Sequence, residues 1–342
     1  MYQNNPLSIN NLMQQTINNL VAKEKGILAM DESNVTIGKR FAAINLENTE
    51  QNRCRYRSLL ATTKDLSNYI SGVILFEETL YQSVLSNNTT IAKTFNDQNI
   101  LVGIKVDQGL APIYHEHEEK ITKGLDNLIE NLSKYQSAGV KFAKWRAVIN
   151  IDAEKNLPSK LAIHINAEQL ARYAAICQSH GIVPIVEPEV LMDGVHNLEQ
   201  CAKTTEKVLI KVFKALRKHG VQLEYMLLKP NMVIASKNCP IIYSPQDVAI
   251  ATVQVLKRTV PAAVPSINFL SGGQTEEQAT NNLNAINKLG IAPWQLSFSF
   301  GRALQESCIN VWKGMDANIA SAQAVLLARA RLNSLANLGL AV

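Results

Sequence analysis

The chain has 342 residues, of which 46% are hydrophobic and 18% are charged. This length suits one α/β barrel with extensions, and the composition allows a large buried core. The net charge of +5 is not gathered in an arm or tail, so it does not indicate a nucleic-acid partner. No segment approaches the length of a membrane span, and the first residues lack a signal-peptide pattern. We therefore expect a cytoplasmic protein that binds neither nucleic acid nor membranes.

The cysteines and histidines do not indicate a metal site. The five cysteines are scattered and form no Cys-x-x-Cys pair, which predicts reduced thiols. His115 and His117 form a His-x-His pattern in the charged segment 114–120, but no third ligand stands at a suitable spacing. We interpret 114–120 as a solvated loop, and we expect no metal and no other cofactor.

Short apolar segments alternate with amphipathic segments through most of the chain. A predicted helix at 7–23 precedes the first strand, and one at 316–337 follows the last. About eight strand–helix units, without a flexible linker or a nucleotide-binding motif, predict a single (β/α)8 TIM-barrel domain over 1–342, with an extra helix at each end. The predicted strands are 26–30, 72–76, 101–106, 140–149, 182–186, 225–228, 266–270 and 296–300, and the clearest helices between them are 167–179, 198–218, 245–257 and 276–288.

Charged or polar residues stand where seven of these strands end. In a parallel barrel these ends meet at the C-terminal mouth, where the active sites of this fold lie. Residues two positions apart on a strand share a face. A single charged strand end is usually solvated. Seven polar or charged strand ends whose charges can pair predict a cluster of coupled titratable groups. A purely structural ion-pair network is the alternative. The residues are Asp31, Lys105 with Asp107, Lys144 with Arg146, Glu187 with Glu189, Lys229, Ser271, and Gly301 with Arg302.

Lys229 ends a short apolar segment and is followed at once by Pro230. A buried ammonium is unfavourable unless it is paired or loses its proton, and a neutral lysine is the nucleophile of Schiff-base enzymes. Lys144 and Lys105 would further disfavour the charged form of Lys229. We expect a neutral Lys229 to attack a ketone, so that the resulting iminium withdraws electrons from the neighbouring carbon–carbon bond. A lysine that reaches the surface is the alternative interpretation.

Two parts of the sequence are candidate phosphate sites. Ser271, Gly272 and Gly273 lead from a strand into a predicted helix, and Gly301 and Arg302 follow the next strand. Backbone N–H groups at such turns bind anions, and a phosphate site after strands seven and eight recurs in this fold. The segment 31–40, beyond the first strand, offers hydroxyls and two cations, although a surface loop that leads into a helix is the alternative. Two anion sites suit a linear ketose phosphorylated at both ends.

At these residues the chain resembles class I fructose-bisphosphate aldolases. The resemblance covers nearly the whole chain, and its motifs are long and specific to the family. It implies reversible cleavage of fructose 1,6-bisphosphate into dihydroxyacetone phosphate and glyceraldehyde 3-phosphate, in glycolysis and gluconeogenesis, by a homotetramer that uses no metal. The matching segments are 25–33, 72–81, 103–107, 142–146, 181–189, 227–233, 269–274 and 299–304, and the similarity continues to 333–336.

The resemblance also implies a role for each site residue. Lys229 would form the Schiff base, and Glu187 would be the main proton-transfer residue. Asp31 and Lys144 would assist cleavage. The substrate-binding candidates are Lys105, Arg146 and Glu189 for the sugar; Ser271, Gly272, Gly273, Gly301 and Arg302 for the phosphate next to the ketone; and Ser33, Thr36 and Arg40 for the distal phosphate.

Two departures from the family pattern matter. Many members have Ser-Thr-Gly-Ser where this chain has Ser33-Asn34-Val35-Thr36, so Thr36 keeps a hydroxyl but we expect the loss of the glycine to reshape the distal phosphate loop, which leaves the relative use of fructose 1-phosphate open. The sequence ends at Leu340-Ala341-Val342, without the tail tyrosine that animal enzymes use near the enamine. We expect that another residue protonates the enamine or that this step is slower.

Two other functions fit parts of the pattern. The first is a related Schiff-base lyase, such as a transaldolase-like enzyme, that acts on another phosphorylated sugar. The two anion sites favour a bisphosphate over that substrate. The second is a barrel kept for a scaffold or binding role, and the intact set of strand-end residues argues against lost catalysis while leaving an added binding role open.

Overall fold

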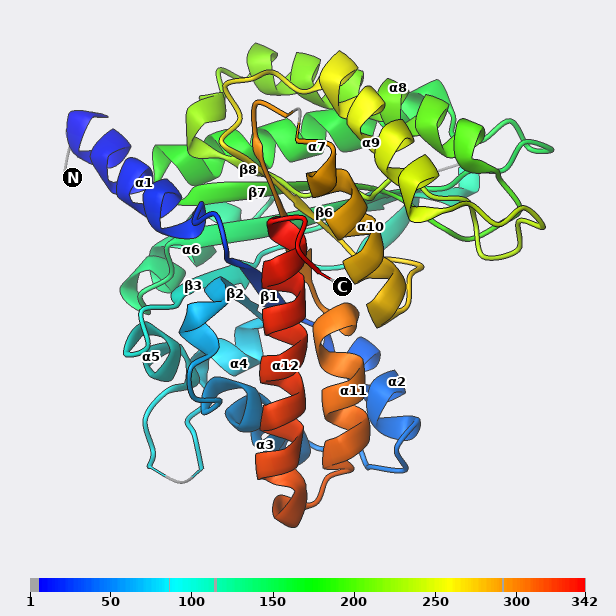
Figure 1. Cartoon of the computed structure of the whole chain (residues 1–342). Helices are drawn as coiled ribbons and strands as arrows, with labels where there is room; N and C mark the ends of the chain where they lie inside the picture. The colour runs from blue at the N-terminus through cyan, green and yellow to red at the C-terminus, as the bar shows by residue number, and fades with distance from the viewer. Residues whose placement is uncertain (1–5, 86, 114–115, 291, 342) are drawn as a thin grey trace.

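The computed structural model describes residues 6–85, 87–113, 116–290 and 292–341. Within these residues, eight parallel strands close into a barrel in the order β1, β2, β3, β6, β7, β8, β9, β10 and back to β1 (Figure 1). A separate two-stranded hairpin joins β4 to β5. The strands are β1 (Gly26–Met30), β2 (Ile70–Leu75), β3 (Leu101–Lys105), β4 (Leu110–Ile113), β5 (Glu116–Thr122), β6 (Phe142–Ile149), β7 (Val183–Val190), β8 (Leu227–Leu228), β9 (Ser266–Phe269) and β10 (Gln295–Phe300).

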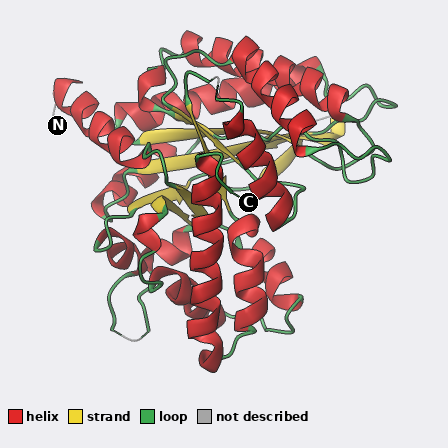
Figure 2. Ribbon diagram, in the orientation of Figure 1, coloured by secondary structure: helices red, strands yellow, loops and turns green. Residues whose placement is uncertain are grey.

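Helices surround the strands (Figure 2). The predicted TIM barrel with an extra helix at each end is therefore confirmed. None of the described helices combines the length and the apolar character that crossing a membrane requires. The helices are α1 (Pro6–Leu20), α2 (Asn34–Ala42), α3 (Glu50–Ala61), α4 (Glu77–Tyr81), α5 (Ile91–Asn96), α6 (Leu128–Ser137), α7 (Lys160–Ser179), α8 (Leu198–Lys218), α9 (Pro245–Thr259), α10 (Glu276–Lys288), α11 (Arg302–Trp312) and α12 (Ile319–Asn337), with short 3-10 turns at Leu66–Asn68, Leu223–Tyr225 and Asp316–Asn318.

Most element boundaries agree with the sequence, and the differences have local causes. The ends of α8 and α10 match the predicted ranges, and each helix starts with a capping box. α7 begins at Lys160, earlier than predicted, because Ser159 caps it. β7 runs on to Val190 because it pairs with β6 along its whole length despite its two prolines. As a result, Glu187 and Glu189 lie within the strand and not beyond it.

The prediction of a solvated loop at 114–120 was wrong. Residues from Glu116 onward form β5, which pairs antiparallel with β4. Glu119 in β5 is buried, and its carboxylate accepts a hydrogen bond from the backbone N–H of Ser159 at 2.8 Å. A charged sequence can form a strand here because the buried carboxylate of Glu119 is paired with the N-cap residue of α7. Tyr114 and His115 of the predicted loop lie outside the described residues.

Two apolar clusters decide which mouth of the barrel can hold a polar site. The larger one lies between the strands and the surrounding helices and includes residues from Leu28 to Ala341. The smaller one fills the barrel interior and contains Met13, Ile17 and Leu20 of α1. α1 packs on the 3-10 turn Leu223–Tyr225 and on strand residues at the N-terminal ends of the strands, so it closes that mouth with apolar side chains. The C-terminal mouth is left for polar groups, as the fold requires.

Candidate active site

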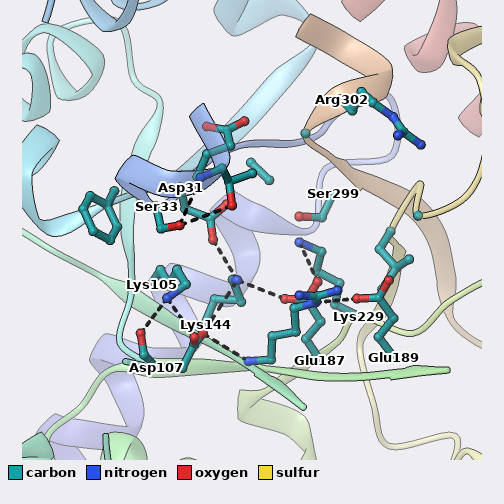
Figure 3. A pocket seen from close by; sticks show the side chains of 18 of the residues that line it. Asp31, Ser33, Lys105, Asp107, Lys144, Glu187, Glu189, Lys229, Ser299 and Arg302 are labelled. Carbon is teal, nitrogen blue, oxygen red and sulfur yellow. Dashed lines mark hydrogen bonds and ion pairs between the residues drawn. The ribbon is translucent and has the colours of Figure 1, made fainter. Parts of the chain in front are cut away.

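A cavity of about 1030 Å³ lies at the C-terminal mouth of the barrel (Figure 3). The site residues predicted from the sequence come from separate strands and loops, and the structure brings all of them to this cavity. They are Asp31, Ser33, Thr36, Arg40, Lys105, Lys144, Arg146, Glu187, Glu189, Lys229, Ser271, Gly272, Gly273, Gly301 and Arg302.

The register of the parallel strands sets the neighbours within the cavity. Lys105 at the end of β3 is paired with Lys144 on β6, and Arg146 on β6 is paired with Glu187 on β7. Because side chains two apart on a strand share a face, Lys144 and Arg146 both reach the cavity, as do Glu187 and Glu189. The alternation in the sequence therefore brings charged side chains from adjacent strands together, with lysines opposite each other between β3 and β6 and an arginine opposite a glutamate between β6 and β7.

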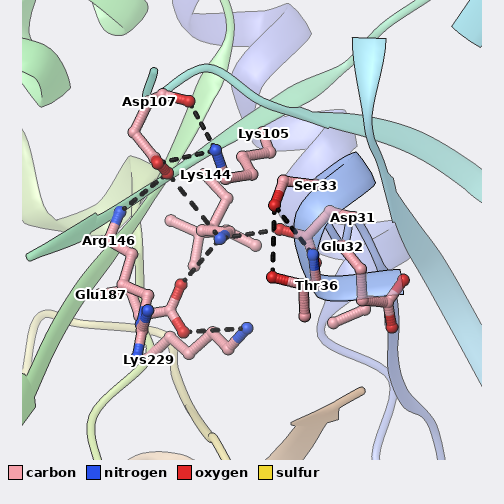
Figure 4. Close-up of polar contacts among 12 residues, drawn as sticks. Asp31, Glu32, Ser33, Thr36, Lys105, Asp107, Lys144, Arg146, Glu187 and Lys229 are labelled. Carbon is pink, nitrogen blue, oxygen red and sulfur yellow. Dashed lines mark hydrogen bonds and ion pairs between the residues drawn. The ribbon is translucent and has the colours of Figure 1, made fainter. Parts of the chain in front are cut away.

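Lys144 is the centre of a buried ionic cluster. Its Nζ lies 2.7 Å from Asp31 Oδ2, 3.2 Å from Glu187 Oε2 and 3.9 Å from Asp107 Oδ2 (Figure 4). Burial alone would lower the pKa of Lys144, but these three carboxylates outweigh it and hold the pKa well above its ordinary value. The ammonium therefore stays charged at neutral pH and fixes the carboxylates around it.

The same cations keep the carboxylates ionised. Burial alone would raise the pKa of Asp31 and of Glu187, yet Lys144 and Lys229 outweigh it, and both pKa values lie below their usual range. Asp31 and Glu187 can therefore accept protons at neutral pH, whereas each would need a transferred proton before it could donate one.

Lys229 lies at the end of β8, and its side chain is almost fully buried. Its Nζ is 3.2 Å from Glu187 Oε1, so one carboxylate joins Lys229 to Lys144. From the sequence we expected repulsion by Lys144 and Lys105 to disfavour the charged form of Lys229. The ion pair that the structure shows for Lys229 is instead with the carboxylate of Glu187. Lys105 pairs instead with Asp107, with its Nζ 2.7 Å from Asp107 Oδ1.

Glu189 joins the ionic cluster to a glycine turn. Its carboxylate forms an ion pair with Nε of Arg146. A Cβ atom added to Gly272 would lie 2.6 Å from Glu189 Oε1, so the turn passes directly against the carboxylate. Only a residue without a side chain fits at Gly272 while Glu189 stays paired with Arg146.

The first candidate phosphate site, which we call the proximal edge, consists of Ser271, Gly272, Gly273, Gly301 and Arg302. The three residues 271–273 precede α10, and Gly301 and Arg302 begin α11. Nη2 of Arg302 donates a hydrogen bond to the carbonyl of Gln274 at 2.9 Å, which ties the two segments together. The glycine turn before α10 and the N-terminal end of α11 both line the cavity, and backbone N–H groups at such places bind anions, so the edge suits a phosphate.

The second candidate site, which we call the distal edge, consists of Ser33, Thr36 and Arg40. Ser33 caps α2, with its Oγ accepting the Thr36 N–H at 3.4 Å, and the two hydroxyl oxygens lie 3.2 Å apart. The 33–36 segment is thus the first turn of a helix, where Asn34 and Val35 adopt helical geometry without a glycine. Figure 3 shows Ser33 and Lys105 on the opposite side of the cavity from Arg302.

Arg40 is the member of the distal edge that lies next to the proximal edge. Its Nη1 forms an ion pair with Glu32. Its Nη2 would be 3.9 Å from a Cβ atom on Gly301, because β1 and β10 are neighbours in the closed barrel. Arg40 and Gly301 are far apart in the sequence, but they lie close in space because β1 and β10 pair to close the barrel.

The sequence argument missed the support behind Arg40. Glu32 is buried and also pairs with Arg57 of α3, at 2.6 Å from Nη2 to Oε2. Gln305 of α11 donates to Glu32 Oε1 at 3.0 Å and to the carbonyl of Ala29 at 2.8 Å. The sequence could have indicated Glu32, because it directly follows Asp31. It could not have indicated that Arg57 is buried, because α3 contains three arginines and nothing in their pattern distinguishes Arg57.

The sequence matches a known family along nearly its whole length. Residues 12–341 match the family described as fructose-bisphosphate aldolase class-I, a glycolytic family. The chain belongs to the class-I fructose-bisphosphate aldolase family. It is thus a carbon–carbon lyase of glycolysis, and enzymes of this class work through a lysine Schiff base.

Individual relatives agree with this assignment. The chain is 55% identical to a fructose-bisphosphate aldolase of Dictyostelium discoideum over 94% of this chain and 90% of that protein. It is 54% identical to "Fructose-bisphosphate aldolase 4, cytosolic" of Arabidopsis thaliana over 92% of this chain and 80% of that protein. A solved structure of the Plasmodium falciparum aldolase, in complex with TRAP and a small-molecule inhibitor, matches with a TM-score of 0.96 and 53% identity over 98% of this chain and 96% of that chain.

Proposed function

We propose that Lys229 forms the Schiff base in the reversible cleavage of fructose 1,6-bisphosphate to dihydroxyacetone phosphate and glyceraldehyde 3-phosphate, in glycolysis and gluconeogenesis. The observation that carries this assignment is the position of Glu187. One of its oxygens is 3.2 Å from Nζ of Lys229 and the other is 3.2 Å from Nζ of Lys144. A base within hydrogen-bond reach of a buried amine is the arrangement that an activated lysine needs.

The proposed steps follow from this contact. Glu187 accepts a proton from Nζ of Lys229, which frees the nitrogen lone pair to attack the ketone carbon. The former carbonyl oxygen gains one proton from the attacking nitrogen and a second from the Glu187 carboxyl group, so that water leaves and the iminium forms. The iminium accepts the electron pair of the neighbouring carbon–carbon bond as that bond breaks. Asp31 takes the proton of the hydroxyl on the carbon that becomes the aldehyde. Lys144 stabilises the negative charge that moves among these carboxylates.

The remaining residues bind and orient the substrate in this proposal. The proximal edge holds the phosphate next to the ketone, and the distal edge holds the other phosphate. Lys105, Arg146 and Glu189 contact the sugar between them. The separation of Ser33 from Arg302 across the cavity in Figure 3 favours a linear sugar with a phosphate at each end.

Borohydride trapping with dihydroxyacetone phosphate, followed by peptide mass mapping, tests the assignment. We expect one adduct, on Lys229. A Lys39→Met variant, which changes another lysine that lines the cavity, should give the same adduct. An adduct on another lysine, or none, would overturn the mechanism. Loss of activity with EDTA and its recovery with zinc would indicate a metal-dependent aldolase instead.

Substrate comparison distinguishes this function from a related Schiff-base lyase. Because there are two anion-binding edges, we expect a higher kcat/KM for fructose 1,6-bisphosphate than for fructose 1-phosphate. Equal turnover of the two sugars would favour the transaldolase-like alternative.

We also propose that the whole chain, residues 1–342, acts as one domain in a cytoplasmic homotetramer, without a cofactor and without a nucleic-acid or membrane partner. The larger apolar cluster, which includes residues from Leu28 to Ala341, supports the single domain. The cytosolic name of the plant relative supports the location. Light scattering should give the mass of four 37.8-kDa chains, and a one-chain mass would contradict the tetramer.

A further inference from the structure

The proximal edge depends on two helices that begin side by side. α12 packs along both α10 and α11, and Figure 1 shows α12 lying against α11. The turn at Ser271, Gly272 and Gly273 leads into α10, and Gly301 leads into α11. An anion held by both segments needs donor distances of about 2.7–3.2 Å from each, so the spacing of the two helix starts must be fixed.

An arginine of α12 touches the first turn of both helices. Nη2 of Arg329 donates to the carbonyl of Glu276, the first residue of α10, at 2.7 Å, and to Thr280 Oγ1 at 2.7 Å. It also lies 3.4 Å from the carbonyl of Ala303, the second residue of α11. The two N–H groups of Nη2 serve the two short contacts, and Nε, the neighbouring donor of the same planar guanidinium, also lies 3.4 Å from the Ala303 carbonyl.

The side chain of Glu276 completes the connection in the other direction. Although Glu276 starts α10, its Oε1 accepts the backbone N–H of Ser307 in α11 at 3.1 Å, and its Oε2 accepts the Ser307 hydroxyl. Nε of Arg329 is 3.8 Å from Glu276 Oε2. The side chains of Glu276 and Arg329 are both 14% exposed, so these charge-assisted contacts are largely shielded from water.

Neither residue belongs to the cavity. Arg329 and Glu276 are absent from its lining, and the proposed mechanism uses neither. Arg329 and Glu276 join α10 to α11 outside the cavity. The hydrogen bond from the Arg302 guanidinium to the Gln274 carbonyl joins the same two segments at the cavity. A network of this kind can hold binding groups within about 0.5 Å of the productive geometry.

We propose that Glu276 and Arg329 are positioning residues, which set the spacing of the two segments that hold the phosphate next to the ketone. This inference rests on the proposed role of the proximal edge. It predicts that loss of Arg329 weakens binding of that phosphate, because the backbone donors of segment 271–273 and of segment 301–302 no longer converge on one anion.

The test compares Arg329→Met with Gln323→Met. Gln323 is also on α12 and also makes two hydrogen bonds to another helix, to Leu59 O and Thr62 Oγ1 at 2.9 Å, but this helix is α3, away from the proximal edge. Arg329→Met should raise the KM of fructose 1,6-bisphosphate and of fructose 1-phosphate by the same factor, about tenfold, with a much smaller change in kcat. The inhibition constant of inorganic phosphate should rise in parallel, and Arg329→Lys should recover part of the loss.

Gln323→Met should lower the melting temperature to a similar extent and leave both KM values unchanged. An Arg329→Met enzyme that matches Gln323→Met in KM and phosphate inhibition would overturn the positioning role. An Arg302→Met variant separates this outcome from a failure of the proximal edge itself. If Arg302→Met leaves the KM of fructose 1-phosphate unchanged, the edge is wrongly assigned; if it raises that KM while Arg329→Met does not, only the positioning proposal fails.

Discussion

The ionic cluster and the two phosphate edges are built in different ways. Lys144 and Glu187 lie on the adjacent strands β6 and β7, Asp31 directly follows β1 across the barrel, and mutual contacts hold the three in a buried place. The edges consist of turns, hydroxyls and helix starts, and their geometry depends on helices that come from distant parts of the sequence. The barrel thus places the chemistry on or directly after its strands and the phosphate recognition on its connections. Changes in the cluster should act mainly on kcat, and changes at the edges mainly on KM.

The largest expected effect is that of Lys229→Met. Removal of the nucleophile should lower kcat by at least about 10⁴-fold, because the residues left can bind substrate without forming the iminium. Glu187 keeps its contact with Lys144, so the fold should survive. A coupled assay for triose phosphates measures the loss, and circular dichroism checks the fold. A folded variant that retains more than about one hundredth of the activity would contradict the assignment.

Lys144→Met tests whether the cluster is also a stability device. In the unchanged protein the folded pKa values of Asp31 and Glu187 lie below their unfolded values of about 3.9 and about 4.3. Their contribution is therefore present above about pH 4 and is lost as the pH falls toward the folded pKa values. Without Lys144 the carboxylates are buried and less compensated, so their pKa values rise, and protonation should stabilise the variant.

We therefore expect Lys144→Met to cost about 3 kcal/mol of unfolding free energy at about pH 8 and less at about pH 5. Guanidinium unfolding at the two pH values measures this slope. Lys93→Met removes an exposed pair with Asp97 and should change the free energy by less than about 1 kcal/mol at either pH. An equal cost for Lys144→Met at both pH values would show that the cluster does not control these titrations.

Gly272→Ala tests the contact between the proximal edge and Glu189, which is paired with Arg146. The added methyl would lie 2.6 Å from Glu189 Oε1, so either the turn or the carboxylate must move. Since Glu189 is held by Arg146, we expect the turn to move and the KM of fructose 1-phosphate to rise by about tenfold. In a Glu189→Asp background the shorter carboxylate leaves room, and the same substitution should have a smaller effect. An equal effect in both backgrounds would mean that this contact does not set the turn.

The sequence made the cluster easier to predict than the edges. A charged residue that ends an apolar strand, such as Lys229, stands out, and alternation along a strand places Lys144 and Arg146 on one face. Contacts across the closed barrel have no such pattern. The approach of Gly272 to Glu189 depends on the packing of separate loops, and the ion pair between Glu32 and Arg57 depends on how α3 docks. Local periodicity could not predict either contact.

The smallest expected effect separates helix capping from phosphate binding at the distal edge. Ser33→Ala removes a hydroxyl and the cap of α2, whereas Thr36→Val removes a hydroxyl and leaves the Ser33 cap in place. Both should raise the KM of fructose 1,6-bisphosphate by a few-fold and leave that of fructose 1-phosphate unchanged, since each loses about one hydrogen bond to the distal phosphate. Only Ser33→Ala should also lose about 1 kcal/mol of unfolding free energy.

Steady-state kinetics with the two sugars, together with guanidinium unfolding, resolves these contributions. If Thr36→Val raises the KM of the monophosphate as strongly as that of the bisphosphate, Thr36 does not act on the distal phosphate. If only Ser33→Ala changes the bisphosphate KM, the helix cap matters more than the Thr36 hydroxyl. In that case the first turn of α2 would serve recognition through its geometry, as the turns of the proximal edge do, because the cap sets the direction in which the N–H groups of α2 face the cavity.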